Sequence, residues 1–299
     1  MPLDLATDYN AFRKAAGAVE LPRDFVRAAG PDVISFLQGQ LSQDVARLAV
    51  GASTWALLLQ PQGKVVAFLR VLRVGDEEVV LETDADFGQA VIERLTRFKL
   101  RVKCDLDPLD WRCVAVRGPA SHEAVENGAG TVVVADWPGL PGADLVGEAP
   151  AAPSAVPVCS LEAYEAVRIE AGIPVMGREI DEKTIPAEVG VVDRSVSFTK
   201  GCYTGQELVA RIDSRGGNVP RHLRLIVVCD GESAPAGATL ELDGKGVGVL
   251  TSVAVSPGRG GSTVALALVR RAIEAPAEVV LSWDGGTAPA RVEALPLVH

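Results

Sequence analysis

Apolar residues recur at helical spacing in several parts of the first two thirds of the chain. In residues 31–45 the positions Val33, Phe36, Leu37 and Leu41 fall on one helical face, after a proline in the first turn. Similar spacing predicts helices over 86–98, 161–171 and 206–215. Apolar runs between them predict strands at 54–59, 64–74, 77–82, 100–104 and 112–116. This mixture of helices and sequentially adjacent strands predicts a compact α+β unit with antiparallel pairing.

The pattern becomes purely strand-like after residue 221. Short apolar runs alternate with glycine and proline turns, of which Asp243-Gly244-Lys245-Gly246 and Asp284-Gly285-Gly286 are typical of hairpins. The predicted strands cover residues 223–229, 239–242, 247–255, 263–269, 278–283 and 288–295. Six short strands without a long helix predict a small closed barrel.

Two irregular stretches lie between these elements, and capping residues mark the ends of two helices. Residues 138–157 are rich in Pro, Ala and Gly and predict a loop, a crossover or a domain boundary. Residues 193–199 form an extended polar run. Ser160 is the expected N-cap of helix 161–171, which Gly172 ends, and Thr204 with Glu207 predicts a capping box for helix 206–215.

The segment K-G-C-Y-T-G-Q-E-L-V-A-R, residues 200–211, combines a thiol, a phenol, an amide, a carboxylate and two cations. Helix capping accounts for Thr204 and Glu207 but not for Lys200, Cys202 or Arg211. Cys202 flanks Lys200 and precedes a helix N-terminus, two features that favour a thiolate. A partly buried thiol that fills a turn is the alternative interpretation. The segment therefore indicates a functional loop with Cys202 as its reactive candidate.

This segment resembles the K-G-C-[YF]-x-G-Q-E hallmark of the YgfZ family, folate-binding relatives of the glycine-cleavage T-protein that serve iron–sulfur proteins. Four further segments agree with the family in the same chain order: F-L-Q-G-Q-L-S-Q-D-V at 36–45, Q-P-Q-G-K at 60–64, R-I-E-A-G-I-P at 168–174 and G-V-L-T-S at 248–252. The resemblance implies a ring of three subdomains, with two interleaved ferredoxin-like α+β units and a C-terminal six-stranded barrel. We accordingly expect a folate-binding region over 1–220, its second subdomain at roughly 52–150, and the barrel over 221–299.

The resemblance also implies a tetrahydrofolate site. Glu170 matches a glutamate expected to accept adjacent N–H donors of the pterin ring, although a solvated helix glutamate would also fit. Arg168 is expected to support that carboxylate.

Five other side chains are expected to serve the same site. Lys200 is expected to hold a folate carboxylate, to stabilise the Cys202 thiolate or to cap a neighbouring helix. Tyr203 is expected to stack on the pterin or to act as a hydrophobic staple. Gln206 and Arg211 are expected along the same wall, and Gln38 is a weaker candidate because one polar helix face would explain it.

An acidic pair of the T-protein is missing from the strand after Gly63. Ala67 and Phe68 stand at those positions, and neither a methyl group nor a phenyl ring can transfer a proton. Three hypotheses remain: a folate-binding accessory factor for iron–sulfur enzymes, such as radical tRNA-modifying enzymes; a folate-dependent one-carbon transferase or demethylase; and a folate-sensing module without chemistry. The missing acids and the presence of Cys202 favour the first, and they make the protein an improbable aminomethyltransferase.

Composition sets the remaining expectations. The 299 residues have a mean hydropathy of +0.21, which predicts a well-buried protein. The formal charge of −10 predicts no direct nucleic-acid binding. We interpret the basic cluster at 94–103 as a solvated face. The five cysteines contain no C-x-x-C pair and the three histidines show no ligand spacing, so we expect no stable metal. Cys104, Cys113 and Cys229 are expected in the core. No membrane-length apolar run and no basic n-region is found, so we expect a cytoplasmic monomer without membrane association.

Overall fold

A computed structural model describes residues 4–229 and 232–296 of the chain. The residues form two compact units, each drawn from separated segments of the sequence. Unit 1 comprises Met1–Leu21, Cys113–Pro174 and Pro220–His299, and unit 2 comprises Pro22–Arg112 and Val175–Val219. The expectation of no signal peptide rests partly on residues 1–3, which lie outside the described residues.

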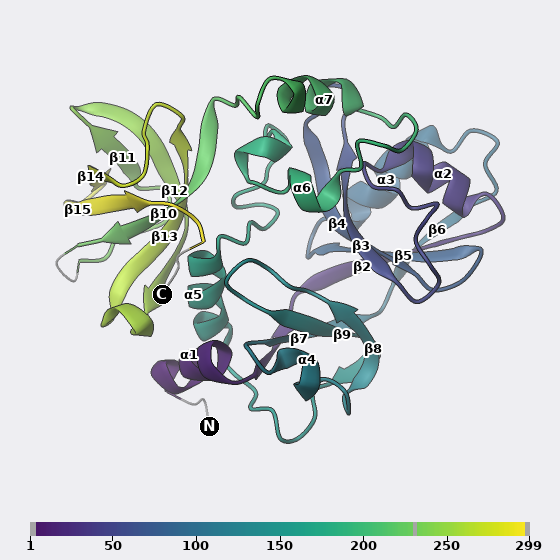
Figure 1. Cartoon of the computed structure of the whole chain (residues 1–299), viewed down its shortest axis with the longest axis horizontal. Coiled ribbons are helices and arrows are strands. Elements are labelled where there is room, and N and C mark those ends of the chain that lie inside the picture. The colour runs from purple at the N-terminus through teal and green to yellow at the C-terminus, as the bar shows by residue number, and fades with distance from the viewer. Residues whose placement is uncertain (1–3, 230–231, 297–299) are drawn as a thin grey trace. The chain divides into compact units, whose positions relative to one another are not determined.

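Unit 2 is built on a five-stranded antiparallel sheet. The strands are β2 (Arg23–Ala29), β3 (Ser53–Leu59), β4 (Val65–Arg73), β5 (Glu78–Asp84) and β6 (Asp105–Leu109), in the order β3-β4-β5-β2-β6. Helices α2 (Val33–Gln40) and α3 (Gly88–Phe98) bury Leu37, Val91 and Leu95 in one core with Leu69 and Leu81 of the sheet (Figure 1). The predicted α+β unit with antiparallel pairing is confirmed here.

Unit 1 contains a second sheet and a barrel. The sheet has the order β1-β7-β9-β8, made of β1 (Gly17–Leu21), β7 (Arg112–Arg117), β9 (Gly142–Ala151) and β8 (Ala129–Val134). The closed barrel has the order β10-β13-β12-β11-β14-β15, which confirms the six-stranded prediction. Its strands are β10 (Arg221–Val228), β11 (Thr239–Leu242), β12 (Lys245–Ser256), β13 (Ser262–Arg270), β14 (Ala277–Trp283) and β15 (Gly286–Glu293).

Helix α5 (Leu161–Ala171) has the predicted bounds and the predicted caps. The Ser160 hydroxyl accepts a hydrogen bond from the Ala163 N–H at 3.3 Å, and Gly172 ends the helix at φ 71°. Ile169 packs against barrel residues Leu225 and Leu266, while α1 (Leu5–Lys14) lies along the same helix. Helix α5 therefore connects the barrel with the N-terminal helix of unit 1.

Several predicted elements need correction. The helix predicted over 31–45 ends at Gln40, because Leu41 turns extended and pairs with Leu58. Residues 100–104 form no strand, and the strand begins instead at Asp105, where Pro108 suits an edge position. Residues 138–157, expected as a loop or boundary, contain β9, and the polar run 193–199 begins within α6 (Val192–Ser195).

The expected subdomain at 52–150 does not match either sheet. Strands from residue 53 to 109 belong to the sheet of unit 2, whereas those from 112 to 151 belong to the sheet of unit 1. Strands β1, β2 and β8 and the short helix α4 (Ser121–Ala124) were not predicted. The ring arrangement of subdomains stays a prediction.

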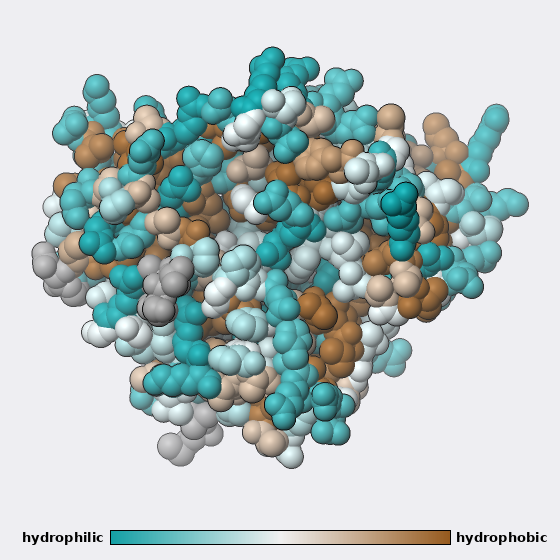
Figure 2. Space-filling model, viewed as in Figure 1, coloured by the Kyte–Doolittle hydropathy of each residue, from teal (hydrophilic) through white to brown (hydrophobic). Residues whose placement is uncertain are grey.

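The surface and the cysteines bear on the remaining expectations. Hydrophilic side chains cover much of the face in Figure 2, with hydrophobic ones in patches between them. Among the described residues, no helix has both the length and the apolar character needed to cross a membrane. Cys104 and Cys113 are buried as predicted, but Cys229 is only half-buried.

Candidate functional site

The loop before helix α7 (Gln206–Ser214) differs from the predicted capping box. The N-cap is Gly205, at φ 84°, and no side chain caps the helix. Instead, the Gln206 side chain turns back and its Oε1 accepts a hydrogen bond from the Tyr203 N–H at 3.2 Å. A Cβ at Gly205 would lie 2.5 Å from the Gln60 carbonyl oxygen. Close packing of the loop on the β3–β4 turn therefore overrides the local capping preference of Thr204.

The predicted turn at residues 60–64 joins β3 and β4 and forms the base for this loop. Gly63 adopts φ 75°, and a Cβ there would approach Leu208 Cβ to 2.6 Å. Glycine is required here because the backbone has a positive φ and because α7 leaves no room for a side chain. The turn thus fixes the start of α7 relative to the sheet of unit 2.

Lys200 anchors the hallmark loop to the end of helix α2. Its Nζ donates to the carbonyl oxygens of Gln38, Leu41 and Gln43, at 2.6, 2.7 and 3.0 Å. An ammonium group at the C-terminal carbonyls of a helix satisfies acceptors that the helix leaves unpaired. Burial lowers the pKa of Lys200 to about 8, although the nearby Asp44 carboxylate opposes that shift. Of the three predicted roles, this geometry matches the helix cap, and it directs the ammonium to backbone rather than to Cys202.

Gln38 belongs to the same framework. Its amide donates to the Asp44 carboxylate at 3.0 Å, and its Oε1 accepts from the Ala46 N–H at 3.1 Å. These bonds organise the chain where α2 ends. Both ends of the Gln38 side-chain amide therefore have partners within the protein, and its predicted contact with folate stays a prediction.

Cys202 is the exposed thiol of the chain, whereas Cys104, Cys113 and Cys159 are buried. Burial raises the pKa of the Cys159 thiol to about 11 and also raises that of Cys104. Phe198, four residues before Cys202, is 50% exposed. The loop therefore presents a thiol and an aromatic ring at the surface.

The neighbouring hallmark side chains differ in exposure. Tyr203 is buried beside Lys200, whose Nζ lies 5.2 Å from the ring centre, and burial raises the pKa of its hydroxyl to about 12. Arg211 is exposed on α7. Stacking of a ligand on Tyr203 would need the ring to become accessible, so that role stays a prediction.

Glu170 lies at the centre of a buried polar network in unit 1. Its carboxylate is fully buried and accepts hydrogen bonds from Tyr9 at 2.9 Å, from Ser256 and from Arg13, with which it forms an ion pair. Burial, followed by the Glu170 charge, raises the pKa of Tyr9. The network joins α1, α5 and the end of strand β12. A solvated glutamate, the alternative considered from the sequence, is thereby wrong.

Arg168 is also fully buried and supports a different carboxylate from the expected one. Its guanidinium forms two hydrogen bonds of 2.9 Å with Glu165, one turn earlier on α5. It also donates to Ser252 Oγ at 2.8 Å on strand β12 and to the Ile173 carbonyl. Arg168 thus binds helix α5 to the barrel and to the chain that follows Gly172.

The positions of the missing acidic pair are buried and apolar. Ala67 is fully buried in the core between sheet and helices, and the Phe68 ring stacks on Trp55 with ring centres 4.7 Å apart. On β5, Glu82 pairs with Arg70, and Asp84 pairs with Arg23 and accepts from the Met176 N–H. No carboxylate replaces the missing acids at residues 67 and 68.

Comparison with known proteins places this architecture. The GCVT N-terminal domain family matches residues 4–136. The tRNA-modifying protein YgfZ of Edwardsiella ictaluri is 30% identical over 225 residues, which cover 64% of this chain and 65% of that protein. Residues 4–136, somewhat less than half of the chain, are therefore similar to the GCVT N-terminal domain. The similarity to YgfZ agrees with the resemblance that the hallmark loop indicated.

Two further proteins extend the comparison. An iron–sulfur cluster assembly factor IBA57 homolog of Neurospora crassa is 29% identical over 256 residues, covering 77% of this chain and 57% of its own. The crystal structure of the glycine cleavage system aminomethyltransferase T from Bartonella henselae shares 22% identity, with a TM-score of 0.83 over 99% of this chain and 90% of that one. The fold is therefore that of the T-protein.

Sequence reasoning missed the partners that surround Glu170. Tyr9 and Arg13 lie on α1, whose ten residues carry only three buried side chains, a weak helical signal. Ser256 is one residue beyond a predicted strand. Nothing in the local pattern connects residues 9, 13, 170 and 256, because they meet only in the folded unit.

Proposed function

We propose that the protein binds tetrahydrofolate and supports the assembly, repair or activity of iron–sulfur enzymes through the Cys202 loop. The observation that carries this proposal is the exposed Cys202 on a loop that Lys200 and Gly205 hold against the body of unit 2. A thiol that must contact a partner needs exposure and an anchored backbone, and the exposure of Cys202 and the contacts of Lys200 and Gly205 on either side of it support such a role. The names of the YgfZ and IBA57 relatives, which refer to tRNA modification and iron–sulfur cluster assembly, support the same role.

The apolar positions 67 and 68 weigh against aminomethyl transfer. Without a carboxylate there, no side chain at these positions can protonate the folate N5 or stabilise a developing cation. We therefore expect no folate-dependent ammonia release from an aminomethyl-lipoyl donor. Robust release would favour the one-carbon transferase instead.

A pterin contact at Glu170 requires the ligand to replace one of the present donors. Tyr9, Arg13 and Ser256 already occupy the two carboxylate oxygens. A pterin N–H pair would have to displace Tyr9 or Ser256 in order to donate to the same carboxylate oxygens. Glu170 thus remains a proposed folate contact, and binding there would cost the hydrogen bond from Tyr9 or Ser256.

The test of the proposed function is the replacement Cys202→Ala. It should fold and bind folinic acid like the parent in calorimetry, because the loop is held by Lys200 and Gly205 rather than by the thiol. In cells lacking the native protein, it should fail to restore the activity of an iron–sulfur enzyme, such as a radical tRNA-modifying enzyme. Thr199→Ala, an exposed change on the same loop, should restore it.

Thiol labelling of the native protein provides an independent readout. Iodoacetamide should modify Cys202 first, while the buried Cys104, Cys113 and Cys159 react only after unfolding. Full rescue by Cys202→Ala, or a Cys202 that resists labelling, would refute the role of the loop and leave folate sensing as the remaining function.

A further inference from the structure

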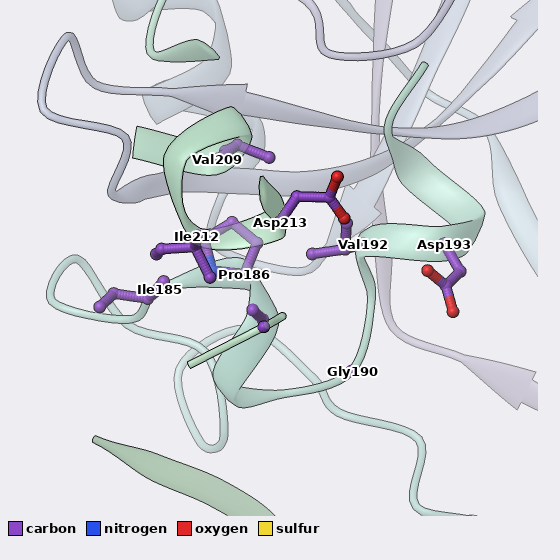
Figure 3. A pocket seen from close by; sticks show the side chains of 10 residues that line it. Ile185, Pro186, Gly190, Val192, Asp193, Val209, Ile212 and Asp213 are labelled. Carbon is purple, nitrogen blue, oxygen red and sulfur yellow. The ribbon is translucent and has the colours of Figure 1, made fainter. Parts of the chain in front are cut away.

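A pocket in unit 2 lies between three short elements that follow one another in the chain. It has a volume of about 210 Å³ and opens between the 3₁₀ helix η1 (Pro186–Glu188), α6 and α7. Figure 3 shows Val209 and Ile212 on the α7 side, with Ile185 and Pro186 on the facing side. Ala187, Gly190 and Gly217 complete the lining without filling it.

Two carboxylates accompany these apolar walls. Asp213 extends from α7 toward Val192, and Asp193 follows Val192 in α6 (Figure 3). Both side chains belong to exposed residues. Within residues 4–229 and 232–296, neither carboxylate has a hydrogen-bond or ion-pair partner. The Asp213 carboxylate lies beside the apolar side chains of the pocket, whereas that of Asp193 lies apart from them (Figure 3).

We propose that this pocket binds a linear primary alkylammonium group, as found in a free polyamine or in a lysine side chain. The apolar walls would cover the alkyl chain, Asp213 would neutralise the ammonium, and Asp193 would add negative charge nearby. The same carboxylates would repel an anionic ligand, so the glutamyl tail of folate does not fit.

The pocket volume supports a small ligand. Pockets for drug-sized molecules measure about 300–1,000 Å³, so 210 Å³ suits a short alkyl chain better than a whole cofactor. An uncharged apolar ligand would gain no attraction from the negative charge at the pocket. The combination of narrow apolar walls and unpaired negative charge therefore selects the alkylammonium class.

The test is an NMR titration of the full-length protein with n-butylammonium chloride. Amide signals of residues 185–193 and 209–217 should shift and saturate, while 1-butanol should bind more weakly. Asp213→Asn should weaken n-butylammonium binding about two- to fivefold, as expected for an exposed ion pair, and Asp193→Asn should weaken it less. Glu182→Gln removes an exposed charge of unit 2 outside the pocket and should leave the affinity unchanged.

Two further ligands distinguish the sources of the group. Tighter binding of spermidine than of Nα-acetyl-lysine amide would indicate a free polyamine, and the reverse order would indicate a lysine of a partner protein. Equal binding of 1-butanol, unchanged affinity in both Asn variants, or no shifts at the pocket would overturn the proposal. None of these outcomes depends on folate or on Cys202.

Discussion

Replacing Glu170 tests whether the carboxylate is a framework group, a folate contact or both. Glu170→Gln keeps the size of the side chain but removes its charge and places an amide N–H₂ in a position surrounded by donors. Tyr9, Arg13 and Ser256 all donate to this side chain, so the amide can satisfy fewer of them. Glu170→Ala removes every acceptor and leaves a cavity.

The size of the effect follows from burial. Glu170 is fully buried and the Arg13 side chain is only 15% exposed. Loss of the carboxylate therefore leaves the Arg13 guanidinium without its ion-pair partner and with little access to water. Removing one partner of a buried ion pair typically costs about 3–5 kcal/mol. The hydrogen bonds of Tyr9 and Ser256 are lost in the same event and do not add in full. We therefore expect either variant to lower the free energy of unfolding by about 3–5 kcal/mol.

Hydrogen exchange measured by mass spectrometry is the suitable assay, because a chain of two compact units need not unfold in one step. Amides of α1 and α5 should exchange faster in both variants, while those of α3 in unit 2 should serve as an internal reference. Glu162→Gln, an exposed change on α5, should alter stability by less than about 0.5 kcal/mol. Unchanged exchange of α5 in Glu170→Ala would refute the reasoning from burial.

Folate affinity separates the second role from the first. Calorimetry of the still-folded Glu170→Gln protein should show at least about tenfold weaker binding of tetrahydrofolate if the carboxylate receives the pterin. Equal affinities, together with faster exchange, would confine Glu170 to the framework.

Two further predictions concern the hallmark loop and the turn beneath it. The pKa of Lys200 is about 8 in the folded protein against 10.5 for a free side chain, so the unfolded chain binds more protons between these values. Stability should therefore rise with pH from about 8 to 10.5, and Lys200→Met should lose this rise when the two unfolding free energies are compared. Gly63→Ala should cost about 1–3 kcal/mol more in urea unfolding than Gly51→Ala, because both glycines have positive φ but only Gly63 packs against a neighbour, Leu208. Equal losses in the two glycine variants would contradict the packing argument.

Local patterns predicted the elements whose ends are marked by local chemistry. Strand 239–242 and helix 161–171 have their predicted bounds, since glycine turns or a serine N-cap bracket them in the sequence. The barrel followed from strand number and turn type. Its closure between β10 and β15 joins residues 62 to 68 positions apart, and only the count of strands indicated it.

Tertiary contacts account for most of the errors. Strand β9 was not predicted, because the composition of residues 138–157 is typical of a loop. The polar Asp144 is buried in this strand by its ion pair with Arg117 of β7, and local composition does not indicate that pairing. The strands after residue 52 follow one another without a visible break, although the chain changes units near residue 112. Register and partner choice depend on residues distant in sequence, and periodicity carries no information about them.

The hallmark loop shows the same limit at the level of single side chains. Its chemical mixture correctly marked it as unusual, but the sequence could not separate residues that build the loop from those that it presents. Lys200 caps α2, Gly205 permits the contact with the β3–β4 turn, and the Gln206 amide accepts from the Tyr203 N–H. These three roles need a defined backbone around residue 202 and do not need a thiol there. Contacts of this kind fix the chain on both sides of Cys202 while the thiol itself stays exposed, and an exposed group on an anchored segment suits contact with a partner in one orientation.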